Sequence, residues 1–109
     1  MEKIFGKNSE TKIDVPMEGF ARKVLAYNDE MMIVEVKLDK GTVLAAHSHV
    51  HTQCTYVVNG KLEFTLEDKV YILESGDSVV SPSNAVHKVV ALEETLVIDA
   101  FNPMREDFI

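Results

Sequence analysis

Short runs of apolar residues separated by turn-forming residues recur along the whole chain. In residues 31–41, MMIVEVKLDKG, apolar side chains alternate with Glu35 and Lys37, which is the period of two of a strand with one buried face. Similar runs follow, namely TYVV, KLEFTL, VYIL, SVV, AVHKVVAL and TLVIDAF, and turn segments such as ESGD, SPSN and EET separate the later ones. Many short strands at this spacing predict an all-β sandwich or barrel.

Two stretches of the chain need a more local interpretation. Asn59 and Gly60 lie between two alternating runs and suit the positive φ angles of a two-residue turn, so we predict a tight hairpin over residues 58–61. Residues 19–32, GFARKVLAYNDEMM, also contain apolar spacings that would suit one turn of helix. Because strands are predicted on both sides of this stretch, we expect it to form a strand as well.

The composition is that of one soluble globular domain covering residues 1–109, with 46% hydrophobic and 27% charged residues. The 18 acidic and 11 basic residues give a net charge of -7, which repels nucleic-acid phosphates and anionic membranes, so we expect neither as a partner. No stretch resembles a signal peptide or reaches the length of a membrane span. The single cysteine, Cys54, cannot form an internal disulfide, so we expect a cytoplasmic protein.

Residues 47–53, HSHVHTQ, hold three of the four histidines of the chain and end in a glutamine. Residues two apart in an extended chain point to the same side, so His47 and His49 can chelate one ion together, and the remaining histidine, His87, can add a third ligand. Neutral imidazole suits zinc, iron, nickel, manganese or copper. An isolated histidine is usually a surface residue, but this clustering favours a site for one divalent transition metal.

The spacing of glycines and ligands around this cluster resembles the two motifs of the cupin superfamily. Residues 41–60 resemble the first motif, through Gly41, His47, His49, Gln53 and Gly60. Residues 76–91 resemble the second motif, through Gly76, Pro82, Asn84 and His87. The resemblance implies a single cupin domain folded as a double-stranded β-helix, or jelly-roll barrel, with metal ligands His47, His49, Gln53 and His87.

The chain departs from the usual cupin motifs at two positions. Asn84 stands where the second motif usually has glycine, and because asparagine tolerates positive φ we expect the turn to be kept. Gln53 stands where most cupins have a glutamate ligand. An amide oxygen binds a metal without adding charge, so the ion would keep its full positive charge, which favours Lewis-acid chemistry over oxygen chemistry. Alternatively, Gln53 is a polar strand residue that forms hydrogen bonds across the barrel mouth.

The last apolar run, TLVIDAF, contains an unexpected charge at Asp99. By alternation this carboxylate shares a face with Val97 and Phe101, so it must be paired, bind a metal, face a wet cavity or have a raised pKa. One interpretation is a strand-end aspartate that pairs with Arg105 and holds the tail. The other is a carboxylate that takes part in the function of the barrel.

The chain as a whole resembles the KdgF-type pectin-degradation cupins. The likeness rests on the HxH pair, the glutamine ligand, MM in an early strand and an ending of the form Asp-x-Phe-x-Pro-x-Arg-x-Asp-Phe, and it runs over residues 19–109. It implies a metal-dependent enzyme that opens the ring of 4,5-unsaturated uronic acid monomers left by pectin or alginate lyases. The product is the linear 5-keto form.

The same resemblance implies roles for the residues near the end of the chain. Asp99 would shuttle protons, and Arg105 would bind the carboxylate of the small anionic sugar acid and take part in catalysis. Phe101 would line the substrate site. Apart from the resemblance, we leave His51 out of the metal ligands and expect it at the cavity rim, where it would contact the substrate. The metal would be nickel, zinc, manganese or iron.

Other functions remain open from the sequence. The same scaffold suits a metal-dependent dioxygenase, and it also suits a cupin that binds a metal or a small metabolite without catalysis, as a sensor or accessory module. A metal-free, epimerase-like cupin is disfavoured by the intact set of histidines. An exposed outer strand and the modest size of the domain lead us to expect a homodimer that pairs by sheet extension.

Overall fold

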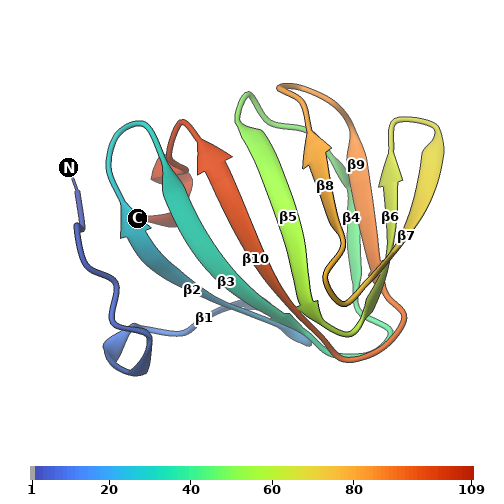
Figure 1. The fold of residues 1–109 in the computed structure, drawn as a ribbon, viewed down its shortest axis with the longest axis horizontal. Coiled ribbons are helices and arrows are strands. Elements are labelled where there is room, and N and C mark those ends of the chain that lie inside the picture. The colour runs from blue at the N-terminus through green and yellow to red at the C-terminus, as the bar shows by residue number, and fades with distance from the viewer. Residues whose placement is uncertain (1) are drawn as a thin grey trace.

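The computed structural model describes residues 2–109, which form ten strands and two short 3-10 helices (Figure 1). The larger sheet contains, in spatial order, β1 (Asp14–Met17), β2 (Phe20–Tyr27), β3 (Met32–Leu38), β10 (Thr95–Asn102), β5 (Thr52–Asn59) and β8 (Ser78–Ser81). The smaller sheet contains β4 (Val43–His47), β9 (His87–Ala91), β6 (Lys61–Leu66) and β7 (Lys69–Glu74). The helices are η1 (Asn8–Glu10) and η2 (Glu106–Phe108).

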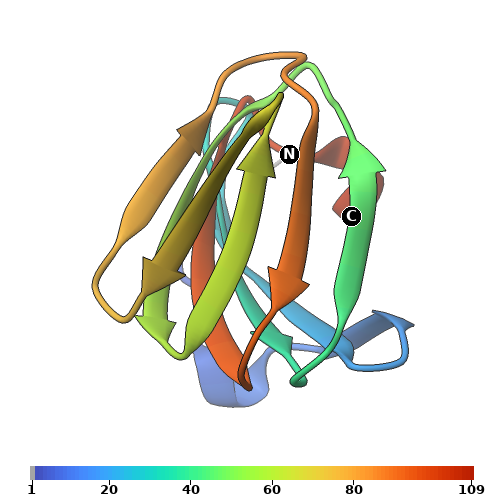
Figure 2. The ribbon, with the colours of Figure 1, turned by 90° about the vertical axis from the view of Figure 1, so that its right-hand side faces the viewer.

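The order of the strands is that of a jelly roll. Apart from β1 and β2, the two sheets read β3-β10-β5-β8 and β4-β9-β6-β7, and the chain passes from one sheet to the other at most of its connections. Figure 2 shows the smaller sheet in front of the strands of the larger one, with the two sheets enclosing a barrel. This architecture confirms the predicted cupin double-stranded β-helix.

The hydrophobic core lies between the two sheets. On β3, every second side chain from Met32 to Leu38 is buried, as the alternation in residues 31–41 predicts. Leu62 and Phe64 of β6 are buried against them from the smaller sheet. Burial of each such side chain contributes about 1.5–3 kcal/mol to stability. The alternating pattern therefore fixes which face of each strand points into the barrel.

Residues 20–27 form strand β2, so the strand interpretation of residues 19–32 is confirmed and no helix forms there. β2 pairs antiparallel with β3 and widens the larger sheet. Phe20 and Val24 of β2 pack against the core, and Arg22 lies between them on the same side of the strand. This strand therefore directs a guanidinium group toward the interior of the barrel.

The predicted hairpin over residues 58–61 is wrong. β5 pairs with β10 and β8, whereas β6 pairs with β7 and β9, and the described residues show no pairing between β5 and β6. The chain instead crosses from one sheet to the other at Gly60, whose φ of 113° is positive although that of Asn59 is not. A Cβ on Gly60 would collide with the side chain of Thr95 and the carbonyl of Glu94, so glycine is needed there for close approach.

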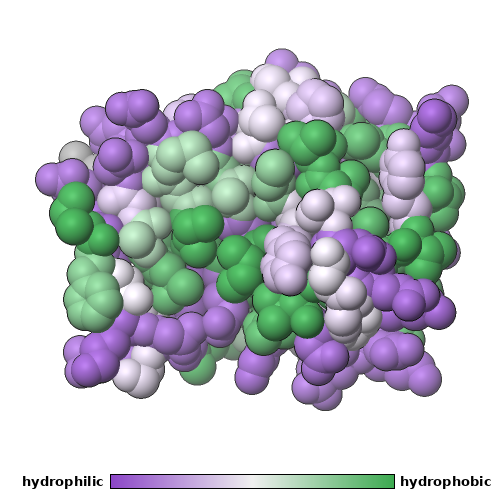
Figure 3. Space-filling view, in the orientation of Figure 1, coloured by the Kyte–Doolittle hydropathy of each residue, from purple (hydrophilic) through white to green (hydrophobic). Residues whose placement is uncertain are grey.

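The outer surface carries apolar side chains and open strand edges. Figure 3 shows apolar groups across the middle of the face seen in Figure 1, with polar groups along its upper and lower edges. Tyr56 and Val58 of β5 and Val80 of β8 are among the exposed apolar residues. Among residues 2–109, no helix is long and apolar enough to span a membrane.

The homodimer stays a prediction that a mass measurement can check. Strands β1 and β8 form the edges of the larger sheet, and β4 and β7 those of the smaller one, so each edge has unpaired backbone groups available to a second copy. Light scattering at micromolar protein concentration is expected to give the mass of a dimer. A monomeric mass would contradict the expected pairing.

Candidate metal centre and active site

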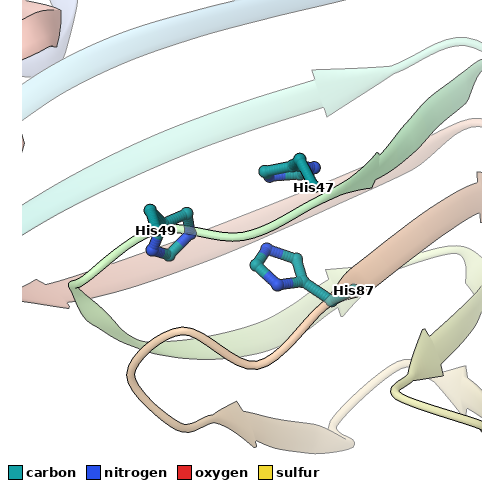
Figure 4. A group of neighbouring side chains, drawn as sticks. All are labelled: His47, His49 and His87. Carbon is teal, nitrogen blue, oxygen red and sulfur yellow. The ribbon is translucent and has the colours of Figure 1, made fainter.

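Three of the four histidines converge at one end of the barrel (Figure 4). His47 ends β4 and His87 begins β9, and the two are direct partners across the antiparallel pair, while His49 lies on the connection from β4 to β5. One nitrogen from each ring lies within 4.8 Å of the other two. His87 is buried, His49 is half-buried and His47 is exposed, so the cluster is reachable from solvent.

Backbone carbonyls orient all three rings in the same way. The Nδ1 atoms of His47, His49 and His87 lie 2.8, 3.0 and 3.1 Å from the carbonyl oxygen of a residue two positions away. A carbonyl oxygen only accepts hydrogen bonds, so each Nδ1 carries the hydrogen and donates it. The lone pair of each neutral ring is therefore on Nε2, which is how metal-binding histidines are commonly held.

The electrostatic environment also favours the form of histidine that binds metals. Burial lowers the pKa of His49 and of His87, and the positive charge of Arg105 lowers the pKa of His49 further. Both rings are therefore neutral at neutral pH. The Nε2 atom of His87 is buried and has no hydrogen-bond partner among the described residues, which is costly unless a ligand satisfies it.

Gln53 completes the candidate ligand set. Its Oε1 lies 3.0 Å from Nε2 of His49, and its amide nitrogen donates to Thr55 Oγ1 at 3.1 Å and to Asp99 Oδ1 at 3.2 Å, which fixes the orientation of the amide. With the hydrogen of His49 on Nδ1, two lone-pair atoms face each other. The distance between these two atoms is the one expected for two ligands of the same ion, each about 2.1 Å from the ion and at right angles to each other. The residues present therefore fit a divalent metal.

Asp99 is anchored through one of its two carboxylate oxygens. It is the direct partner of Thr55 across β10 and β5, and Oδ1 accepts hydrogen bonds from Thr55 Oγ1 at 2.6 Å and from Gln53. Burial raises the pKa of Asp99 to about 6, against the opposing effects of these hydrogen bonds and of Arg105. Among residues 2–109, Oδ2 has no hydrogen-bond partner. No ion pair joins Asp99 to Arg105 among these residues, in contrast to the sequence interpretation in which this pair holds the tail.

The C-terminal tail returns to the barrel and brings Arg105 to the cavity. Arg105 donates from Nε to Asp107 Oδ1 at 3.0 Å and from Nη2 to Asp107 Oδ2 at 2.9 Å, and this lowers the pKa of Asp107. Its guanidinium carbon lies 5.1 Å from the ring centre of Phe101 and 4.3 Å from that of Phe108. The tail is therefore held by a two-bond ion pair and by contacts between a cation and aromatic rings.

A cavity of about 280 Å³ lies between the two sheets beside the histidines. Most of the residues predicted from the sequence line it, namely His47, Gln53, His87, Asp99, Phe101 and Arg105. His49 and His51 are not among its lining residues. His51 lines an outer depression together with Asp107, and its ring packs against those of His49 and Phe101, with centroids 5.4 and 6.4 Å away. The cavity volume is slightly below the range of about 300–1,000 Å³ that is usual for ligand pockets, so the cavity suits a small ligand.

Among the lining residues that the sequence interpretation did not assign to the site are Arg22, Thr55 and Phe108. Arg22 follows the alternation of β2 between two core residues, so a firmer strand prediction for residues 19–32 would have placed its side chain inside. Thr55 follows Gln53 at the two-residue spacing of β5. Phe108 belongs to the tail, and no periodic signal there indicates that it folds back onto the barrel.

Comparison with known proteins agrees with this fold. Residues 34–100 match the cupin domain family. The chain is 38% identical over 94 residues to the pectin degradation protein KdgF of Dickeya dadantii (strain 3937), which covers 84% of this chain and 86% of the relative. The structure of KdgF from Halomonas sp. is similar with a TM-score of 0.91 and 40% identity, over 96% of this chain and 97% of that one.

A further solved structure supports the same grouping. An RmlC-like cupin from Shewanella frigidimarina NCIMB 400 has a TM-score of 0.93 and 34% identity, over 98% of this chain and 96% of that one. The two structural matches extend over nearly the whole chain. The chain therefore belongs to the cupin family and, within it, to the KdgF proteins.

Proposed function

We propose that this protein opens the ring of 4,5-unsaturated uronic acid monomers released from pectin or alginate, and so gives the linear 5-keto form. The proposal rests mainly on Asp99, whose carboxylate lines a cavity beside three converging histidines. One of its oxygens is held by hydrogen bonds, and the other accepts none from the described residues. A pectin degradation protein among the relatives supports the same substrate class.

The reaction is an isomerisation that needs no co-reactant. A proton leaves the anomeric hydroxyl for Oδ2 of Asp99, the bond between carbon 1 and the ring oxygen breaks, and carbon 1 becomes an aldehyde. The electron pair of that bond forms an enolate over the ring oxygen, carbon 5 and carbon 4. Carbon 4 then takes a proton, for which Oδ2 is the available donor. A pKa of about 6 suits an acid that must both accept and return a proton near neutral pH.

The remaining residues of the site bind and orient. His47, His49, Gln53 and His87 would hold a divalent metal, which when bound supplies a Lewis acid that stabilises negative charge on oxygen. Asp107 occupies the Nε–Nη2 edge of Arg105. The opposite edge of the guanidinium, between its two terminal nitrogens, can still form a two-bond contact with a carboxylate.

Product analysis distinguishes this proposal from its two rivals. We expect the metal-loaded protein to convert lyase-generated unsaturated monomers to a 5-keto acid, identified by NMR, without consuming oxygen. Conversion that requires iron and O₂ would favour a dioxygenase instead. Tight binding of the monomer with no conversion beyond the spontaneous rate would favour a binding module, which needs no proton shuttle at Asp99.

Gln53→Glu is expected to keep the metal and to lower turnover about 10-fold or more. An anionic oxygen attracts a divalent ion at least as well as an amide oxygen does. However, a carboxylate cannot donate to Asp99, so Asp99 loses a hydrogen bond and faces a like charge. Metal content and ring opening are measured on the same samples. Equal turnover at equal metal occupancy would show that the amide is not needed.

A further inference from the structure

The cavity contains a second guanidinium that no interpretation of the sequence assigns. Arg22 of β2 lines it, and the charged residues of the lining are otherwise only Asp99 and Arg105. The side chain of Arg22 is 17% exposed, so most of it is removed from water. In a protein with a net charge of -7, two arginines in one small cavity form a local exception to the overall charge.

The donors of Arg22 are poorly satisfied within the protein. Its Nε is buried and has no hydrogen-bond partner among the described residues. The nearest carboxylate oxygen, Oδ2 of Asp14, is 4.0 Å from Nε, which is too long for a hydrogen bond. A buried, charged donor without an acceptor is costly, so a ligand that accepts its hydrogen bond would remove this cost.

Arg22 and Arg105 lie around the same aromatic ring. The guanidinium carbons are 3.8 and 4.3 Å from the ring centre of Phe108. Burial lowers the pKa of Arg22, and the neighbouring charge of Arg105 lowers it further, although Asp14 and Asp107 oppose this. Both cations contact this ring, so an anion at its edge would be attracted by both. Asp107 already occupies one edge of Arg105, whereas Nε of Arg22 forms no hydrogen bond within residues 2–109 and has only the Asp14 carboxylate at 4.0 Å.

We propose that Arg22 binds the carboxylate of the uronate substrate, together with the open edge of Arg105. The inference rests on the proposed function for the identity of the ligand. Arg22 and Phe108 also line a shallower outer groove of about 610 Å³, so they form the wall between that groove and the cavity. A carboxylate bound at this wall would lie on the tail side of the cavity, and the rest of the sugar would extend toward Asp99.

Binding of an unreactive pair of sugars tests Arg22 separately from catalysis. Galacturonate carries the carboxylate without the reactive double bond, and galactose lacks the carboxylate. By calorimetry on the metal-loaded protein, we expect the parent to prefer galacturonate and Arg22→Gln to bind it about 10- to 100-fold more weakly. With the unsaturated substrate, KM should rise by a similar factor while kcat changes little, because the contact is made before and during reaction.

Lys23→Gln is the matched control, because Lys23 is the neighbouring residue on β2 and its Nζ donates to the carbonyl and the side chain of Asn8 on the exposed side. It should bind galacturonate like the parent. Arg22→Lys keeps the positive charge but loses the two-bond contact of a guanidinium, so it should also bind galacturonate less tightly than the parent. If thermal unfolding shows that Arg22→Gln does not fold, Arg22→Lys is used in its place.

Two results would overturn the role of Arg22. One is a parent protein that does not prefer galacturonate to galactose, and the other is unchanged galacturonate binding in the Arg22 variants. A different result bears on the proposed function alone. If the parent binds galacturonate through Arg22 but does not open the unsaturated ring, the carboxylate site stands and the ring-opening proposal fails.

Discussion

Replacing both His49 and His87 by alanine is expected to remove the bound divalent metal completely. The two rings supply two of the three converging nitrogens, and each is held by a backbone carbonyl so that Nε2 faces the cluster. His47 and Gln53 alone would leave too few ligands to hold an ion tightly at neutral pH. Elemental analysis after dialysis against metal-free buffer gives the metal content. Added metal should also raise the unfolding temperature of the parent but not of the variant.

His51→Ala is the matched control for this experiment. His51 belongs to the same histidine-rich segment, yet its ring lies outside the converging group and on the outer depression of the tail. We expect this variant to keep the full metal content of the parent. Full metal content in the double variant would show that the ion, if bound, is held elsewhere. Loss of metal in the His51 variant would extend the ligand set beyond the converging nitrogens.

Asp99→Asn is expected to lower the rate of ring opening by about 10²–10⁴-fold and to leave the metal content unchanged. The amide oxygen of asparagine can still accept the hydrogen bonds from Thr55 and Gln53, so the support of the site is kept. The change replaces the basic oxygen, Oδ2, which accepts no hydrogen bond from any residue of the described chain, by an amide nitrogen. The rate is followed by product formation, with the metal measured on the same samples.

Thr55→Val separates the loss of the base from the loss of its anchor. Valine has nearly the shape of threonine, and it removes the 2.6 Å hydrogen bond to Asp99 without removing the carboxylate. We expect a smaller fall in rate than for Asp99→Asn, since Gln53 still donates to Oδ1. If Asp99→Asn turned over as fast as the parent, Asp99 would only position Gln53 and would not transfer the proton.

Much of this fold follows from local patterns in the sequence. The alternation from Met32 to Leu38 identifies the buried face of β3 because a half-buried strand must place every second side chain in the core. Asn84 has a φ of 65°, as expected of a residue that replaces glycine in a turn. The pair His47 and His87 is less local, because only the register of β4 with β9 brings the two rings together.

The wrong hairpin shows where local patterns stop being informative. Gly60 has the positive φ that the turn prediction requires, and the strands on both sides alternate as expected. However, the choice of partner strand depends on the packing of the whole barrel, which pairs β5 with β10 and β6 with β9. Turn chemistry restricts the backbone at one point and does not determine which sheet the next strand joins.

Arg22 was missed for a related reason. A charged residue within an apolar alternation is the same signal that identified Asp99, but the stretch around Arg22 also fitted one turn of helix. A helix would have placed Arg22 on the face opposite to Phe20 and Val24, so the inward direction of Arg22 depended on the strand assignment. The position of Phe108 depends on the folding back of the tail, which long-range contacts with Arg22 and Phe101 determine.

The rate of loss of the ultraviolet absorbance of lyase-generated unsaturated monomers tests metal-dependent ring opening most directly. Ring opening removes the conjugated double bond, so the absorbance falls as the reaction proceeds. We predict that the metal-loaded protein accelerates this loss well above the spontaneous rate, that chelator-treated protein does not, and that added divalent metal restores the rate. Equal rates with loaded protein, stripped protein and buffer alone would contradict the proposed function.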